Sequence, residues 1–290
     1  MHHTKSYSRI IAGTMTWGSW GKQLSTDGKV ELIHACAEIG ITTFDHADIY
    51  GNYDNEAEFG SALRKSGIDR SAIQLISKCG IQMTRGRTNK VKHYEYSKEY
   101  IVWSAEESLR KLQTDYLDLF LLHRPSPLMR PQEIGEAVQK LVDDGKIKQF
   151  GVSNFSPSQI ALLETAWPVS GNQVEFSLTH DKPMYDGTFD DCLVNDRMAM
   201  AWSPLGSFFK EDTEQNQRIS QVIDELKEKY NADESQLLLA FIQKHPVSVY
   251  PVVGTTNSKR LANAVVASKI DLELEDWFLL LEASKGKRVP

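Results

Sequence analysis

The stretch "ELIHACAEIGITTFDHADIYGN", residues 31–52, contains the unit that decides the fold. An amphipathic segment ends at Gly40, a residue that stops helices, and an apolar and β-branched run follows directly in residues 41–44. Asp45 and Tyr50 come next, where a strand should end. Strand ends are places for chemistry in alternating α/β proteins, so this carboxylate and phenol serve either catalysis or the stability of a turn.

The same succession of helix and strand recurs along the chain, without a linker or a low-complexity tract. Eight runs have strand patterns: residues 8–18, 41–47, 73–80, 116–123, 147–155, 170–176, 197–205 and 248–255. Each is followed by at least one helical pattern, which predicts a parallel sheet. With no separate second domain, an α/β fold of the closed (β/α)8 TIM-barrel type is favoured over an open doubly wound sheet. We expect residues 1–290 to form this single domain, with an extra C-terminal helix in residues 272–290.

The composition narrows the function classes. The chain has 290 residues, 41% of them hydrophobic, and a net charge of −6, which argues against a nucleic-acid-binding surface. The basic residues between Arg85 and Lys98 are predicted to lie in a solvated loop. No apolar run reaches the roughly 18–20 residues of a membrane span, and residues 1–9 do not have the pattern of a signal peptide.

The cysteines are Cys36, Cys79 and Cys192, an odd number without clustering. This pattern indicates reduced thiols in a cytoplasmic protein, and it argues against a disulfide framework or a zinc site. Cys79 follows Lys78 and should face the opposite side of its strand, so we expect it to pack in the core. The expected partner is a small molecule rather than a nucleic acid or a membrane.

In a closed barrel the polar residues at the strand ends gather at one mouth, where the active site lies. These residues are Asp45, Tyr50, Lys78, His123, Ser153, Asn154, Gln173, Trp202, Ser203 and the loop 254–256.

Four of them form a chemical unit. The ammonium of Lys78 should project into the mouth, where Asp45 is its partner. A cation close to Tyr50 is predicted to lower the pKa of the phenol from about 10 toward neutrality. Tyr50 could then pass a proton to an oxygen that becomes negative, while His123 donates a hydrogen bond to it. This set suits the addition of a hydride to a carbonyl group.

Taken alone, each residue has a structural interpretation. Asp45 or Tyr50 could stabilise a turn, Lys78 could be a surface lysine, and His123 could be a turn histidine with its hydrogen bonds made within the protein. A metal site of Asp45, His46 and Asp48, as in a metal-dependent hydrolase, is a further alternative. Adjacent strand residues point to opposite faces, however, and no second His or Cys has ligand spacing with them. We therefore expect no metal.

Seven stretches, in order, resemble the aldo-keto reductase family over nearly the whole chain. They are "FDHADIYGN" (44–52), "LISKCG" (75–80), "YLDLFLLHRPSP" (116–127), "GKIKQFGVSNF" (145–155), "NQVEFS" (172–177), "AWSPLG" (201–206) and "VVGTTNSKRL" (252–261). The "HRPSP" form and the C-terminal sequence are most similar to a bacterial subgroup of NADPH-dependent oxidoreductases. The resemblance implies reduction of aldehydes or ketones to alcohols by hydride transfer from NAD(P)H.

The resemblance also implies roles for individual residues. Tyr50 is the general acid, Lys78 lowers its pKa, Asp45 orients Lys78, and His123 orients the carbonyl. Ser153, Asn154 and Gln173 would hold the nicotinamide carboxamide, Trp202 would stack on its ring in place of the family's usual tyrosine, and Ser203, Pro204, Leu205 and Gly206 would border the pyrophosphate.

The adenine end is implied to lie at the loop of Gly254, Thr255 and Thr256. Arg260 matches a family arginine that grips the 2′-phosphate, with Lys259 beside it and backbone N–H groups of the next helix adding to the anion site. NADPH is therefore expected rather than NADH. The chain has no G-x-G-x-x-G turn, which counts against a Rossmann dehydrogenase.

Aromatic residues beside the mouth suggest a pocket for an apolar or aryl carbonyl compound, or else simple loop packing. They are Trp17, Trp20 and Phe208, with Phe209 next in sequence. The family also includes cofactor-binding, redox-sensing regulatory subunits with little turnover, which remain the alternative function. A monomer is the expectation that the family suggests.

Overall fold

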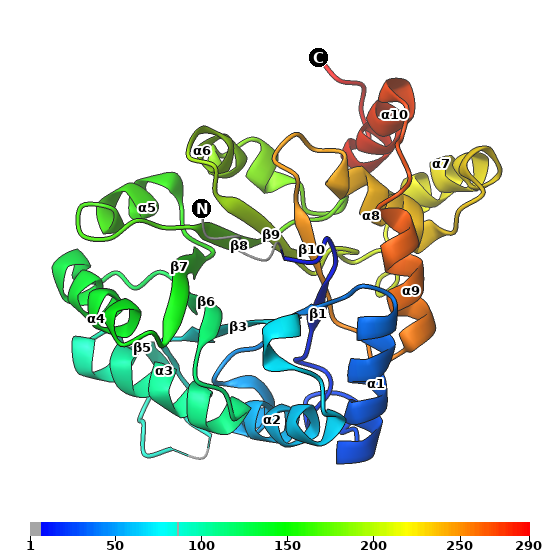
Figure 1. Cartoon of the computed structure of the whole chain (residues 1–290). Helices are drawn as coiled ribbons and strands as arrows, with labels where there is room; N and C mark the ends of the chain where they lie inside the picture. The colour runs from blue at the N-terminus through cyan, green and yellow to red at the C-terminus, as the bar shows by residue number, and fades with distance from the viewer. Residues whose placement is uncertain (1–6, 86) are drawn as a thin grey trace.

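The structure is a computed structural model, and it describes residues 7–85 and 87–290. Residues 1–9 were expected to have no signal-peptide pattern, and residues 1–6 of them lie outside the described residues. Eight parallel strands form a closed barrel in which chain order is spatial order (Figure 1). The strands are β1 (Ile11–Gly13), β2 (Thr43–Asp45), β3 (Gln74–Cys79), β6 (Leu117–Leu122), β7 (Ile147–Ser153), β8 (Gly171–Glu175), β9 (Met198–Trp202) and β10 (Tyr250–Val253). Each run expected to be a strand contains one of them, and the (β/α)8 prediction is confirmed.

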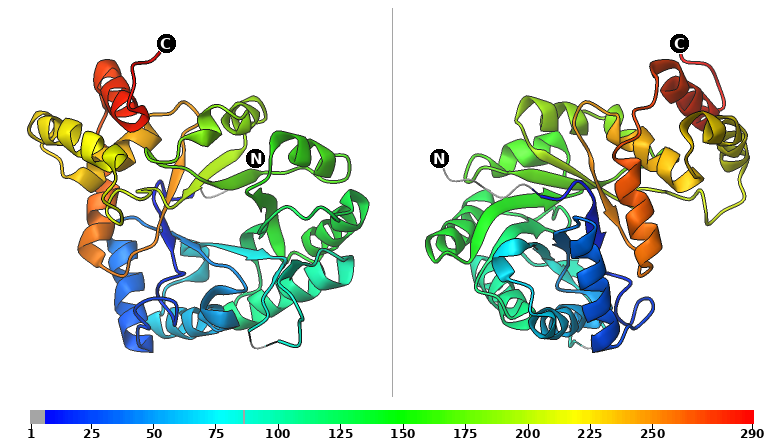
Figure 2. Two further views of the ribbon diagram at one scale, coloured as in Figure 1. Left: turned by 180° about the vertical axis from the view of Figure 1, so that it is seen from behind. Right: turned by 45° about the vertical axis from the view of Figure 1, so that its right-hand side comes forward.

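Helices surround the barrel (Figure 2). They are α1 (Thr26–Glu38), α2 (Asn55–Ser66), α3 (Lys98–Leu112), α4 (Pro131–Asp143), α5 (Pro157–Leu163), α6 (Thr188–Val194), α7 (Glu214–Tyr230), α8 (Glu234–Gln243), α9 (Ser258–Ala267) and α10 (Leu274–Lys285). The predicted extra C-terminal helix is α10. It packs beside α7 and α8, where the Trp277 ring stacks on Phe241 with centroids 4.7 Å apart.

One small sheet was not expected. β4 (Ile81–Gln82) pairs with β5 (His93–Tyr94) in antiparallel fashion, so the predicted solvated loop after Arg85 is part of a hairpin that leads into α3. Gly86, within this loop, lies outside the described residues. Two-residue strands give no periodicity from which a sequence pattern could be recognised.

The strand alternation decides which side chains face the barrel interior. One buried cluster fills the barrel, and its members are Ile11, Ile76, Leu119, Leu121, Met200 and Val252. The larger cluster packs between strands and helices, and it includes Leu75 and Cys79. Lys78 and His123 share the inward parity of Ile76 and Leu121, so both point along the barrel toward its mouth. The expectation that Cys79 packs in the core is confirmed.

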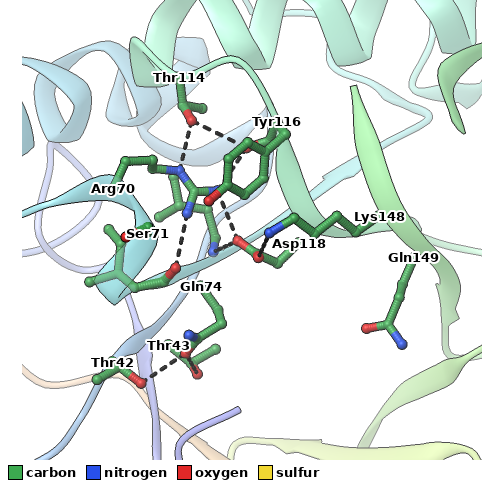
Figure 3. Close-up of polar contacts among 12 residues, drawn as sticks. Thr42, Thr43, Arg70, Ser71, Gln74, Thr114, Tyr116, Asp118, Lys148 and Gln149 are labelled. Atoms are coloured by element: carbon green, nitrogen blue, oxygen red, sulfur yellow. Dashed lines mark hydrogen bonds and ion pairs between the residues drawn. The ribbon is translucent and has the colours of Figure 1, made fainter. Parts of the chain in front are cut away.

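An ion-pair group, the lower cluster, lies near the opposite end of the barrel and is made of Arg70, Asp118 and Lys148 (Figure 3). The Asp118 carboxylate accepts from the Arg70 guanidinium at 2.8 Å, from the Leu75 backbone N–H at 2.9 Å and from the Lys148 ammonium at 3.0 Å. Both cations also lie over the Tyr116 ring, at 4.0 and 3.7 Å. Groups at this face of a barrel serve stability, because the strands' carboxyl ends are at the other face.

Within residues 7–85 and 87–290, no helix is both long and apolar enough to cross a bilayer.

Candidate active site

Lys78 and Asp45 form a buried ion pair at the mouth of the barrel, as predicted. Their exposed fractions are 0% and 1%. The Lys78 ammonium donates to both Asp45 oxygens at 2.8 and 2.7 Å, to the His46 carbonyl at 2.8 Å and to the Tyr50 hydroxyl at 3.3 Å. A buried ammonium needs such a set of acceptors to offset its lost hydration.

Tyr50 reaches this pair through a tight turn after β2. The turn spans Tyr50–Tyr53, and Gly51 and Asn52 both take left-handed backbone angles, with φ of 60° and 58°. Glycine and asparagine adopt this region at the lowest steric cost. The Tyr50 ring lies at the mouth, with its centroid 5.1 Å from the Lys78 ammonium.

The predicted lowering of the Tyr50 pKa is wrong for this structure. Burial raises the pKa of the phenol above its ordinary value of 10.0, and the opposing charge of Lys78 does not fully compensate. Burial is the largest single influence on the pKa of Lys78 and acts to lower it, but the charges and hydrogen bonds of Asp45 and Tyr50 together outweigh burial, and the net shift is upward. At neutral pH the site therefore holds a protonated phenol beside a charged ammonium.

His123 completes the predicted group of four. Its ring meets the Tyr50 ring edge-on, with centroids 6.1 Å apart. Burial, followed by the positive charges of Lys78, Arg124 and Lys92, holds the pKa of His123 well below 6.5. The imidazole is therefore neutral at physiological pH, and it can donate one N–H without adding a charge.

The two other polar residues of this stretch face the helix layer. The His46 ring packs 4.3 Å from Phe59, its Nδ1 lies 2.9 Å from the Thr14 hydroxyl, and burial lowers its pKa to about 3. Asp48 lies 3.3 Å from the Tyr100 hydroxyl, and burial raises its pKa to about 8. Asp45 and His46 thus point to opposite faces, as expected. In the part of the chain that the structure describes, no group of three or more His, Cys, Asp or Glu side chains could hold a metal ion.

A second polar group follows β7, β8 and β9. The Asn154 amide donates to Ser153 Oγ at 2.7 Å, Ser153 Oγ donates to the Gln173 carbonyl at 2.8 Å, and Trp202 Nε1 donates to Asn154 Oδ1 at 3.0 Å. Gln173 Nε2 in turn donates to Asp45 Oδ1 at 2.8 Å. This last contact links the two polar groups and could not be found in the sequence, because 128 positions separate the partners.

The loop after β9 is held by its backbone. Ser203 and Gly206 both have positive φ, 49° and 55°. A Cβ atom on Gly206 would lie 1.9 Å from Thr179 Oγ1, so only glycine allows the loop to pack against the segment after β8. Pro204 is buried and Leu205 is half-buried, so the loop's backbone is fixed at the mouth.

At the start of α9, Lys259 and Arg260 are exposed. The backbone N–H groups of these two residues are already engaged, because Asn257 Oδ1 accepts from both, at 2.9 and 3.2 Å. The exposed side chains of Lys259 and Arg260 are free to meet an anion, and the prediction that N–H groups at the start of α9 add to the site stays a prediction. Gly254 lies beside open space, since a Cβ there would meet nothing within 4 Å.

Of the predicted aromatic lining, one residue is misplaced. Trp17 is 1% exposed and packs on Phe44 and Phe59 in the outer core, so its assignment to the substrate pocket is wrong. Trp20 is half-exposed, and its ring centroid lies 6.2 Å from that of Tyr50.

Phe208 packs edge-on against Phe209, with centroids 4.9 Å apart. Both line an open hollow of about 490 Å³ beside α7, and none of the four residues of the Tyr50 group lines it. Phe208 thus lines this hollow, and its contact with a substrate at Tyr50 stays a prediction.

Comparisons with known proteins agree with this geometry. The family model "Aldo/keto reductase family" matches residues 9–284. The uncharacterized oxidoreductase YcsN of Bacillus subtilis is 38% identical over 98% of this chain and 96% of its own. The 6-dehydroglucose reductase of Agrobacterium fabrum is 36% identical over 89% of this chain and 88% of its own. The crystal structure of an aldo-keto reductase from Klebsiella pneumoniae in complex with NADPH has a TM-score of 0.78 and 26% identity, covering 98% of this chain and 92% of that one.

The chain belongs to the aldo/keto reductase family. It is accordingly an NAD(P)H-dependent oxidoreductase that reduces carbonyl compounds.

Proposed function

We propose that the chain is an NADPH-dependent reductase of aldehydes or ketones in which Tyr50 is the proton donor. The observation that carries this proposal is the 3.3 Å contact between the Lys78 ammonium and the Tyr50 hydroxyl, in a mouth that also holds neutral His123. The phenol keeps its proton at neutral pH, and the protonated form is the one that reduction needs.

Each residue then has one task. His123 donates an N–H to the carbonyl oxygen and fixes its position against Tyr50. The bound reduced nicotinamide supplies the hydride that the carbonyl carbon accepts. As negative charge develops on the oxygen, the Tyr50 O–H bond breaks and the proton moves to it. Lys78 stabilises the phenolate, which regains a proton from solvent, so the alcohol and the oxidised cofactor are formed with one proton consumed. Asp45 keeps Lys78 charged and in place.

The donor set fits such a cofactor. Ser153, Asn154 and Gln173 offer the mixed donors and acceptors that a carboxamide requires, and Trp202 offers an aromatic face. Residues 203–206 would border the pyrophosphate, with Gly254, Thr255 and Thr256 on the adenine side. The exposed side chains of Lys259 and Arg260 favour a 2′-phosphate, hence NADPH, and the Klebsiella relative is a precedent for this cofactor.

The substrate is proposed to be a small carbonyl compound that contacts Trp20. We also propose a monomer in a reducing compartment such as the cytoplasm, since Cys36, Cys79 and Cys192 are free and buried. The Agrobacterium relative is named for a sugar aldehyde, so polar aldehydes belong in a substrate panel beside aryl aldehydes.

The test mixes purified protein with NADPH and a panel of aldehydes and follows the loss of nicotinamide absorbance. Tyr50→Phe should lower kcat by about 10²- to 10⁴-fold, the range for loss of a positioned proton donor. Tyr185→Phe, at an exposed tyrosine, is the matched control and should leave kcat unchanged. Full activity in Tyr50→Phe would contradict the proposal. Tight NADPH binding without turnover in the unaltered chain would favour the regulatory alternative.

A further inference from the structure

Arg124 is a cation at the mouth that the mechanism above does not use. It directly follows His123 at the end of β6 and is half-buried. Its guanidinium carbon lies 5.4 Å from the Trp202 ring centroid. Within residues 7–85 and 87–290 its side chain makes no ion pair and no hydrogen bond to protein, which leaves the N–H donors available.

The backbone of Arg124 is firmly held. The Tyr96 hydroxyl donates to the Arg124 carbonyl at 2.5 Å and accepts from its N–H at 3.2 Å. Tyr96 can reach this position because residue 80 is glycine: a Cβ on Gly80 would lie 2.0 Å from the Tyr96 ring. Arg124 therefore combines a fixed backbone with a guanidinium whose N–H donors can bind an anion.

The charge of Arg124 acts on the reacting groups. Burial is the main influence on both pKa values: it raises the pKa of Tyr50 and lowers the pKa of His123. The positive charge of Arg124 acts to lower both. Lys92, an exposed residue just before β5, also lowers the pKa of His123. Two cations from different elements, β6 and the hairpin, therefore make this side of the mouth positive.

The strand order places these groups around a substrate. β2, which leads to Tyr50, lies between β1, which leads to Trp20, and β3 with β6, which lead to the cationic side. A carbonyl oxygen held at Tyr50 and His123 would thus have an aromatic wall on one side and the two cations on the other. The residues expected at the cofactor's phosphates follow β9 and β10, and Arg124 lies between them and Tyr50, with its guanidinium beside Trp202 at the end of β9.

We propose that Arg124, assisted by Lys92, binds an oxyanion on the substrate, so that the preferred substrates are carbonyl compounds bearing a carboxylate or a phosphate. The guanidinium can hold either anion with paired N–H donors. The inference rests on the proposed function, since it concerns the substrate of the same site.

The test compares aldehydes that differ only in charge. The pairs are 4-carboxybenzaldehyde with its methyl ester, and glyceraldehyde 3-phosphate with glyceraldehyde. The unaltered chain should give a higher kcat/KM for the anionic member of at least one pair, and added salt should reduce that preference because salt screens charges. The pair that shows the preference identifies carboxylate or phosphate as the anion.

Arg124→Gln should then lower kcat/KM for the preferred anion about 10- to 100-fold, the range for a lost hydrogen bond to a charged group, mainly through KM. The neutral member should change less than about 3-fold, since it makes no such bond. Arg124→Lys should restore part of the preference, and Lys92→Gln should have a smaller effect because Lys92 is exposed. Arg130→Gln, at an exposed arginine before α4, is the matched control and should have no effect.

The outcomes separate two failures. If the unaltered chain reduces none of the four aldehydes or any other in the panel, the proposed function fails. If it reduces both members of each pair equally well and is insensitive to salt, only the anion preference is overturned. If Arg124→Gln weakens NADPH binding, measured by quenching of tryptophan fluorescence, and slows both members equally, Arg124 serves the cofactor and the inference is wrong.

Discussion

Each end of the barrel has an ion pair, fully buried at the mouth and partly buried in the lower cluster, and the two pairs differ in what surrounds them. In the lower cluster, Arg70 donates to Thr114, to two backbone carbonyls and to Asp118, and Asp118 accepts from three groups. At the mouth, Lys78 and Asp45 also have several hydrogen-bond partners. Their neighbours Tyr50 and His123, however, can still form hydrogen bonds with a ligand.

His123, at the mouth, has a ring nitrogen that is free to form a hydrogen bond. Its Nδ1 is buried without a hydrogen-bond partner among the described residues, whereas the carboxylate of Asp118 accepts three hydrogen bonds. An unsatisfied buried polar atom costs free energy, and such costs persist mainly at functional sites. The comparison teaches that a buried charge pair marks function only when its neighbours still have donors and acceptors to offer.

The largest expected loss of activity is for a substitution of Lys78 at the mouth of the barrel. Lys78→Met should lower kcat/KM by roughly 10²- to 10⁴-fold, because the phenolate left after proton transfer loses its stabilising charge. It should also cost about 3–5 kcal/mol of unfolding free energy, since Asp45 is then buried without its cation. The double variant Lys78→Met with Asp45→Asn should regain stability in urea titrations but not activity. If the double variant recovers activity, the Lys78 charge has no role in the reaction.

Asp118→Asn, in the lower cluster, should reduce stability without reducing activity. It leaves Arg70 partly buried without a carboxylate, so unfolding in urea should require about 2 kcal/mol less. The kcat/KM should stay within about 2-fold, because no reacting group touches this face. Lys148→Gln is the control and should change little, since that side chain is 52% exposed. A large loss of activity in folded Asp118→Asn would remove the distinction between the two ends.

The sequence predicts the fold well because the signal is local. Most helices and barrel strands lie in their own apolar or periodic run, some of which end at a stop residue such as Gly67 with φ of 70° after α2, and the alternating order of these runs favours a closed barrel. The inward side of Lys78 also follows from alternation. The β4–β5 hairpin was missed because its strands are too short to have a period.

The site was predicted less completely, for physical reasons. The link from Gln173 to Asp45 spans the barrel, and the burial of Trp17 depends on Phe44 and Phe59, which only the folded chain brings together. The direction of the Tyr50 pKa was misjudged because a sequence shows the nearby charge but not the degree of burial.

We propose that Tyr50 is protonated at neutral pH and delivers its proton to the substrate. The most direct test is the pH dependence of kcat/KM for reduction. Because the Tyr50 pKa is raised above 10.0, the active form is lost only as the pH rises through that higher value. His123 stays neutral down to well below pH 6.5, so no loss should occur between that pH and about pH 9. The predicted profile is flat across neutrality, with a fall only above pH 10 that is absent in the residual activity of Tyr50→Phe. A decline centred near pH 7 that disappears in Tyr50→Phe would contradict the account.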